Sequence, residues 1–208
     1  MKFAAISDTH GMHRQLHVPD ADVLIHAGDF CMRGDLQEAV SFLNWFSALP
    51  HRYKIFIAGN HDFCFEKASA EELRRLIPEN LIYLNDSGVC VEGLNIWGSP
   101  VQPWFFNWAF NRQRGADIKK HWDLIPANTD ILIVHGPVEG VLDKIYSGEH
   151  VGCKDLLTTV NSIKPKAFVC GHIHEAYGHV DLNGTHFINA SNLNRNYKMV
   201  HAPIEFVI

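Results

Sequence analysis

Five short apolar stretches of the sequence each end in polar residues that could bind a metal ion or take part in acid–base chemistry. These polar ends are Asp8-Thr9-His10, Gly28-Asp29, Gly59-Asn60-His61-Asp62, His135-Gly136 and Gly171-His172-Ile173-His174. Carboxylate, imidazole and amide groups without a thiolate favour Mn, Fe, Zn, Co or Ni over Cu(I) or an iron–sulfur cluster. The set therefore indicates a site for divalent metal ions.

The number of these groups indicates two ions. The candidate ligands are Asp8, His10, Asp29, Asn60, His135, His172 and His174. This set is too large for one tetrahedral ion but sufficient for two ions that share a carboxylate. Two ions ~3.5–4 Å apart stabilise both the attacking and the leaving oxygen of a phosphoryl displacement. The predicted chemistry is therefore metal-dependent phosphoester hydrolysis.

Each of these short patterns alone is weak evidence. D-x-H and G-D occur by chance in many proteins, and a single histidine at the end of a strand is more often a hydrogen-bonded structural residue. The pairs Asp8 and His10, then His172 and His174, add information because residues two apart in an extended chain point to the same side. The recurrence of such ends after every apolar stretch is the observation that favours a site.

The apolar stretches themselves have the length and composition of buried strands. They are KFAAIS (2–7), DVLIHA (22–27), YKIFIA (53–58), DILIVH (130–135) and KAFVC (166–170). Such nearly continuous apolar stretches are typical of strands covered on both faces. In open α/β sheets the ligands bind beyond the carboxyl ends of the strands, so these polar ends could meet at one place.

Helical and hairpin patterns fill the segments between and after these strands. Helices are predicted from Asp35 to Pro50, from Ser69 to Pro78 and over residues 154–163, the first two with capping-box spacing at their starts. Hairpins are predicted at Glu92-Gly93 and Asn183-Gly184, and a last strand in PIEFVI. No repeat, low-complexity tract or linker interrupts the chain, so we expect one α/β domain over residues 1–208 with mixed sheets.

Composition excludes several classes of protein. The chain has 208 residues, 47% of them apolar, and a formal net charge of −5, which argues against a protein that coats long nucleic acid. Its five cysteines form no C-x-x-C pair and are expected to be reduced thiols. No stretch approaches the ~20 apolar residues of a membrane helix, and no secretory leader is visible, so we expect a cytoplasmic protein.

The ordered motifs D-x-H, G-D, G-N-H-D, H-G and G-H-x-H resemble those of the calcineurin-like metallophosphoesterase superfamily. They extend from Asp8 to His174 and thus span most of the chain. Four further segments look like the metallophosphoesterase-domain-containing branch, which is related to the class III cyclic nucleotide phosphodiesterases. These segments are WGSPVQPWFFNWAFNR (97–112), HVGCKDLL (150–157), GHIHEAYG (171–178) and NASNLNRNYK (189–198).

The resemblance implies a fold and a set of residue roles. The fold would be a four-layer αββα sandwich, with two mixed sheets flanked by helices. One metal would be held by Asp8, His10, Asp29 and His174, and the other by Asp29, Asn60, His135 and His172. Asp29 would bridge the two ions, and a hydroxide bridging them would attack phosphorus. His61 would protonate the leaving oxygen or stabilise the transition state, and Asp62 would orient His61 and keep it protonated.

The resemblance also implies a function with alternatives. We expect hydrolysis of phosphodiester bonds in small nucleotide-like substrates, such as 2′,3′- or 3′,5′-cyclic nucleotides, with Mn²⁺ as the first choice of metal and Fe, Zn, Co or Ni as others. No long nucleic acid or membrane partner is expected, and the oligomeric state is left open. The alternatives are a phosphomonoesterase or protein phosphatase, or a scaffold that has the fold without the activity.

Three further features leave their roles open. Arg33 in G-D-F-C-M-R-G resembles a phosphate-binding arginine of the protein phosphatases, or else is a solvated loop residue. The aromatic segment 104–110 could stack on a nucleobase, although core packing is the more common role of such residues. His150 lies in a segment typical of the branch and could approach the substrate.

Overall fold

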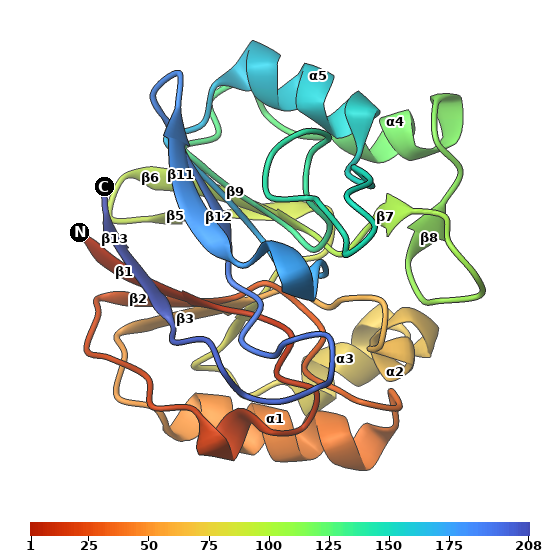
Figure 1. The fold of residues 1–208 in the computed structure, drawn as a ribbon. Helices are drawn as coiled ribbons and strands as arrows, with labels where there is room; N and C mark the ends of the chain where they lie inside the picture. The colour runs from red at the N-terminus through yellow and green to blue at the C-terminus, as the bar shows by residue number, and fades with distance from the viewer.

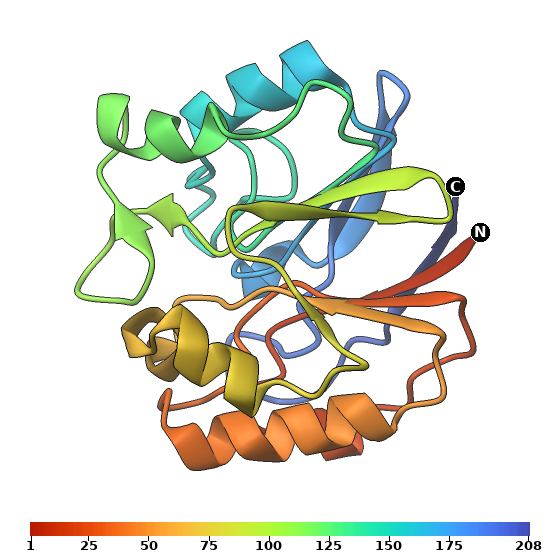
Figure 2. The same cartoon turned by 180° about the vertical axis from the view of Figure 1, so that it is seen from behind.

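Two β-sheets lie face to face in this protein, and helices cover the outer face of each. The structure is a computed structural model that describes residues 1–208. Figure 1 shows the four layers as helices, sheet, sheet and helices, and Figure 2 shows the same layers from behind. The predicted αββα sandwich is confirmed.

The first sheet has five strands in the order β13-β1-β2-β3-β4. Their bounds are Ile204–Val207, Lys2–Ile6, Val23–His26, Tyr53–Phe56 and Ile82–Tyr83. The strands from β1 to β4 are parallel, and β13 pairs with β1 in the antiparallel sense. This pairing places the two chain termini side by side (Figure 1).

The second sheet has six strands in the order β11-β12-β10-β9-β6-β5. Their bounds are Gly178–Leu182, Thr185–Asn189, Ala167–Cys170, Ile131–Val134, Leu94–Ser99 and Ser87–Val91. The four central strands are parallel, whereas β11 and β5 are the antiparallel edges of the two predicted hairpins. A separate pair, β7 (Gln102–Pro103) with β8 (Asn111–Arg112), lies beyond the sheet.

Five α-helices form the outer layers. The first sheet is covered by α1 (Leu36–Ala48), α2 (Phe63–Lys67) and α3 (Ala70–Leu76), and the second by α4 (Ala116–Trp122) and α5 (Lys154–Ile163) (Figure 1). The predicted capping box at Ser69 and Glu72 is formed in full at the start of α3. Short 3₁₀ turns occur at His13–Gln15 and His174–Ala176. No helix is long and apolar enough to cross a membrane.

The alternation of side chains along each strand divides the core into three apolar layers. In β1, Phe3 and Ala5 pack between the two sheets, whereas Ala4 and Ile6 pack under the helices of the first sheet. A third cluster, which includes Trp122, lies between the second sheet and its helices. Since both faces of the parallel strands are buried, most of their side chains are apolar, and the candidate ligands come from the chain beyond the strand ends.

Candidate active site

A cavity of about 260 Å³ opens beyond the carboxyl ends of the parallel strands of both sheets. Its lining includes residues from the loops after β2, β3 and β10, together with the 104–110 segment and the chain near residue 195. Five of the predicted site residues line it, namely Asp29, Asn60, His61, His172 and His174. The expected convergence of sequence-distant strand ends is therefore present.

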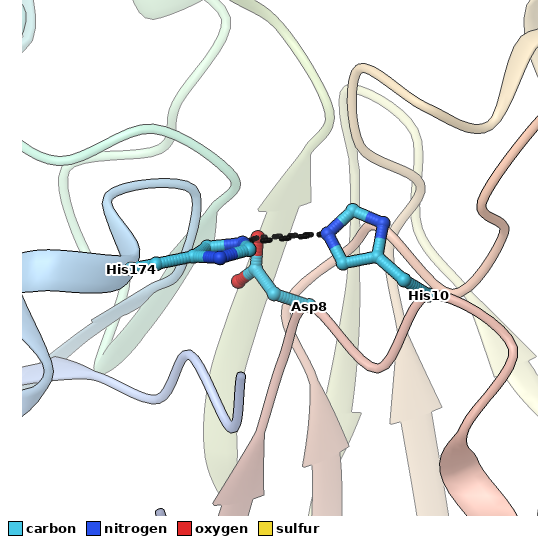
Figure 3. Close-up of side chains that lie close together, drawn as sticks. All are labelled: Asp8, His10 and His174. Carbon is cyan, nitrogen blue, oxygen red and sulfur yellow. Dashed lines mark hydrogen bonds and ion pairs between the residues drawn. The ribbon is translucent and has the colours of Figure 1, made fainter. Parts of the chain in front are cut away.

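One group of potential ligands consists of Asp8, His10 and His174. Figure 3 shows the Asp8 carboxylate between the two imidazole rings. The His174 Nε2 atom lies 3.3 Å from Asp8 Oδ1 and 3.3 Å from His10 Nε2. His10 Nε2 is 4.0 Å from the same Asp8 oxygen. All three side chains thus present ligand atoms to one point.

A second group contains Asp29, His135 and His172, with Asn60 beside them. The Asn60 Oδ1 atom lies 2.9 Å from His135 Nε2 and 2.7 Å from His172 Nδ1. Asp29 Oδ2 is 3.4 Å from His135 Nε2 and 3.8 Å from His10 Nε2, an atom of the first group. Asp29 is therefore placed between the two groups, as a shared ligand must be.

Backbone carbonyls select which nitrogen of three histidines faces the site. The Nδ1–H of His10 donates to Cys31 O at 3.0 Å, that of His135 to Ala27 O at 2.9 Å and that of His174 to Asn194 O at 3.1 Å. Because a carbonyl can only accept, each ring carries a proton on Nδ1 and directs its Nε2 atom toward the site. Metal-binding histidines are usually held in this way.

Burial and mutual charge shift the titration of these groups in opposite directions. Burial lowers the pKa of His10 to about 4 and that of His172 to about 3. Burial also opposes charge on His135, yet the Asp29 carboxylate raises its pKa to about 9. Burial alone would raise the pKa of the Asp29 carboxyl, but the neighbouring histidines hold this pKa below its usual range. Metal binding would have to displace the proton of His135, so it should release protons.

The backbone at four of the candidate ligands adopts a conformation that non-glycine residues rarely take. The φ angles are 53° at Asp8, 40° at His10, 56° at Asp29 and 69° at His172. Such left-handed conformations are uncommon outside glycine and concentrate at functional sites. This strain is consistent with loops shaped to direct side chains at a common centre.

Two glycines permit the close approach of these loops. A Cβ atom at Gly59 would overlap the Asp29 carboxylate, and one at Gly171 would overlap the side chains of Ser7 and Asp8. These positions therefore exclude any side chain because the space is filled by the site itself.

The structure gives His61 and Asp62 different partners from those expected. His61 Nδ1 donates to Met32 O at 2.8 Å, so a backbone carbonyl and not Asp62 orients its ring. Asp62 is fully buried, and its Oδ2 accepts from the N–H of Asp29 at 3.0 Å and of Gly59 at 2.7 Å. Its Oδ1 accepts from Cys31 N at 2.9 Å. The expectation that Asp62 orients His61 is corrected: Asp62 ties together the loops after β2 and β3.

The three open features also find places. Arg33 is exposed and does not line the cavity, and its backbone N–H donates to the Glu38 carboxylate. His150 pairs with Asp143 at 2.5 Å outside the cavity lining. Of the 104–110 segment, Phe110 is buried in the core, but Trp104 and Phe106 are 49% and 79% exposed. Core packing is thus wrong for most of this segment.

Phe105 and Trp108, which belong to the aromatic segment with two predicted roles, line the cavity. Arg195 and Tyr197, from the segment after β12, also line it and were not singled out from the sequence. Arg195 lies over the ring of Tyr146, 4.2 Å from its centroid. The segment 189–198 carried only a family likeness, with no pattern that would single out its arginine.

Comparison with known proteins assigns this arrangement to a family. The family model for calcineurin-like phosphoesterases matches residues 1–176. This chain belongs to the calcineurin-like phosphoesterases. It is 42% identical, over 98% of its length, to metallophosphoesterase domain-containing protein 1 of Homo sapiens, 69% of which is covered. It is 37% identical over its whole length to a UPF0046 protein of Caenorhabditis elegans, 75% of which is covered.

Solved structures of more distant proteins share the fold of this phosphoesterase. TT1561 of Thermus thermophilus aligns over 90% of this chain and 88% of its own, with a TM-score of 0.60 and 11% sequence identity. At this identity the likeness concerns the fold alone.

The donor set of this phosphoesterase chain fits divalent metal ions. Every candidate ligand atom is an imidazole nitrogen, a carboxylate oxygen or an amide oxygen, and all the ligand side chains are buried except the half-buried His172. Buried charges and imidazoles of this kind are costly unless they are paired or coordinate metals. The residues present therefore suit two cations that share the Asp29 carboxylate.

Proposed function

We propose that this chain is a phosphodiesterase that uses two divalent metal ions to hydrolyse small nucleotide-like substrates. The observation that carries the proposal is the pair of ligand groups that meet at Asp29 on one side of a cavity of about 260 Å³. Two divalent ions that share a ligand are an arrangement suited to phosphoryl displacement. The family assignment supports phosphoester chemistry, and the preference for diesters is part of the proposal.

In this proposal the ligands divide between the two ions as the groups suggest. One ion would be held by Asp8, His10, Asp29 and His174, and the other by Asp29, Asn60, His135 and His172. When bound, the ions, proposed to be Mn²⁺, would neutralise phosphate charge and make water a nucleophile at neutral pH. The backbone carbonyls bonded to Nδ1 of His10, His135 and His174 fix the orientation of these imidazole rings.

His61 is the proposed general acid. Since its Nδ1–H is engaged by Met32 O, its Nε2 is the atom free to give a proton to a leaving oxygen. The indole of Trp108 stacks on the ring, with the centroids 4.2 Å apart and an interplanar angle of 27°. The His61 backbone N–H also donates to Asp29 Oδ1 at 2.7 Å, which couples the position of the acid to the shared ligand.

The rest of the cavity favours a small ligand with one aromatic end. Phe105 and Trp108 offer ring faces on which a nucleobase could stack, and Arg195 offers a cation near the cavity. A net charge of −5 gives no attraction for a long polyanion. Arg33, the best support for a protein phosphatase, does not line the cavity. The proposed substrates are therefore nucleotide-sized diesters such as cyclic nucleotides.

The test is hydrolysis of bis-p-nitrophenyl phosphate and p-nitrophenyl phosphate by the purified protein with Mn²⁺. The Asp29→Ala variant should lose diester turnover, while Asp20→Ala, an exposed aspartate outside the cavity, should keep it. Faster monoester than diester hydrolysis would replace the proposal with a phosphomonoesterase. No turnover of either ester by metal-loaded protein would leave the fold as a scaffold.

A further inference from the structure

The β11–β12 hairpin carries a second set of metal-ligating side chains, far along the chain from most of the active-site ligands. We call His179, Asp181 and His186 the hairpin cluster; their ligand atoms face one another on the surface. None of the three lines the active-site cavity. The cluster is therefore a feature that the proposed phosphodiesterase function does not use.

The strand register brings these residues together. Asp181 and His186 are directly opposite in the antiparallel pair, and His179 lies two residues before Asp181 on the same strand. Cross-strand partners have neighbouring Cβ atoms, and residues two apart point to the same face. The cluster is thus a consequence of strand pairing and not of a loop that could take another shape.

The backbone beneath the cluster is well anchored. The turn residues Asn183 and Gly184 have φ angles of 53° and 84°, as a two-residue hairpin turn of the favoured hand requires. Strand β12 also pairs with β10 along its length, and the His186 N–H donates to Lys166 O at 2.9 Å. Little ordering of the backbone would accompany binding of a ligand here.

The distances within the cluster approach those of a tetrahedral metal site. His179 Nε2 lies 3.2 Å from His186 Nδ1 and 3.2 Å from Asp181 Oδ1. A tetrahedral zinc ion with bonds of ~2.0–2.1 Å has ligand atoms about 3.3 Å apart. The contact of His186 Nδ1 with Asp181 Oδ1, at 2.5 Å, is shorter and would have to open.

A simple Asp–His ion pair accounts for only part of this arrangement. It requires one imidazole on the carboxylate, and His186 holds the pKa of the Asp181 carboxyl below its usual value. The second imidazole adds a ring nitrogen 3.2 Å from the first, so that two nitrogens and one oxygen face a common point. Two imidazoles with a carboxylate form a donor set that suits Zn²⁺ and neighbouring transition metals.

We propose that His179, Asp181 and His186 bind one divalent transition-metal ion of the zinc class. Three protein ligands would leave a fourth position open to water, because the side chains of the cluster are 30%, 69% and 33% exposed. The ion links the edge strand β11 to β12 across the hairpin. It is independent of the catalytic ions and of the phosphodiesterase proposal.

The first test is the number of Zn²⁺ ions bound at equilibrium by the full chain and by the His186→Ala variant. We expect the variant to bind one ion fewer than the wild-type chain. The matched control is His17→Ala, which removes an exposed histidine that makes no side-chain hydrogen bond and should bind as many ions as wild type. Because the readout is a difference between chains, it does not depend on how fully the catalytic site is loaded.

A second measurement separates a specific site from a change in folding. The Zn²⁺-dependent rise in melting temperature should be smaller in His179→Ala and in His186→Ala than in His17→Ala, while diester hydrolysis by all three stays equal to wild type. Equal Zn²⁺ numbers in His186→Ala and His17→Ala would overturn the proposal. A loss of diester hydrolysis in His186→Ala would also count against it, since the cluster would then act on the catalytic site.

Discussion

Replacing Asp62 with asparagine should destabilise the metal-free protein and disturb the site without removing any proposed ligand. Asp62 accepts three backbone hydrogen bonds, two on Oδ2 from Asp29 and Gly59 and one on Oδ1 from Cys31. An asparagine of the same shape has one acceptor oxygen and one NH₂ group. The NH₂ group of the asparagine must therefore face a backbone N–H, so that two donors meet and no hydrogen bond forms there.

The magnitude follows from this mismatch. The less costly orientation keeps the two bonds to Asp29 and Gly59 and leaves the Cys31 N–H buried without a partner, which costs ~1–3 kcal/mol. The two retained bonds lose their charge assistance, worth about 1 kcal/mol each. The substitution also removes a carboxylate whose pKa is raised by burial and by the nearby Asp29, which offsets part of the loss. We expect a net loss of about 2 kcal/mol.

The assay is urea unfolding of metal-free protein, with Asp20→Asn as a control at an exposed aspartate. A loss of about 2 kcal/mol should lower the urea midpoint by about 1 M for typical denaturant slopes. An Asp62→Asn midpoint equal to that of Asp20→Asn would refute the hydrogen-bond reasoning.

A double substitution distinguishes loop anchoring from the originally expected role in orienting His61. If Asp62 acts through His61, adding Asp62→Asn to His61→Ala should cause no further fall in turnover. If Asp62 anchors the loops after β2 and β3, the two effects should add, and Asp62→Asn alone should weaken metal binding. The structure favours the second result because Asp62 bonds to the backbone of Asp29 and His61 bonds to Met32.

Three further predictions concern single side chains. His61→Ala should lower diester turnover ~10²–10⁴-fold at unchanged metal content measured by elemental analysis, because a general acid is removed and no proposed ligand is lost. Trp108→Ala should raise the KM for a nucleotide diester more than for bis-p-nitrophenyl phosphate, because the proposed stacking on a nucleobase is lost. Equal rises in the two KM values would argue that the indole only packs against His61 and does not contact the base. Burial lowers the pKa of His26 from 6.5 to about 3, so its contribution to stability is present above pH 6.5 and is lost as the pH falls toward 3. His26→Gln should accordingly flatten the decline in the free energy of unfolding of metal-free protein over this range, and parallel curves for variant and wild type would contradict the assignment.

Regular elements of the fold were predictable because local sequence determines them strongly. The five apolar stretches became β1, β2, β3, β9 and β10, and the capping box at Ser69 and both hairpin turns formed where the sequence indicated. Helix α1 begins after Asp35 as expected. Its helical period places Leu36 and Val40 on the same face as Leu43, yet Leu36 and Val40 are 57% and 38% exposed, while Phe42 is buried. Helical period identifies a face only to within about one residue position, because tertiary packing sets the final rotation.

The supporting features of the site could not be predicted in this way. Which atom of Asp62 meets which backbone N–H depends on how the loops after β2 and β3 approach each other, and no spacing in the sequence records that. Arg195 and Tyr197 reach the cavity through an irregular segment after β12. Their positions depend on loop packing, for which neither helical nor strand period gives a signal.

The strained ligand backbones explain why the site needs such support. A residue held in the left-handed region costs ~1–3 kcal/mol, and this condition applies at Asp8, His10 and Asp29. Strain of this kind persists only where surrounding contacts hold the loop in its conformation. Both ligand loops make such contacts. The Asp29 and Cys31 N–H groups bond to Asp62, and the Asp8 carboxylate accepts from Ser191 Oγ at 2.9 Å. Since these contacts are made by protein groups alone, the fold itself bears part of the cost of ordering the ligand loops.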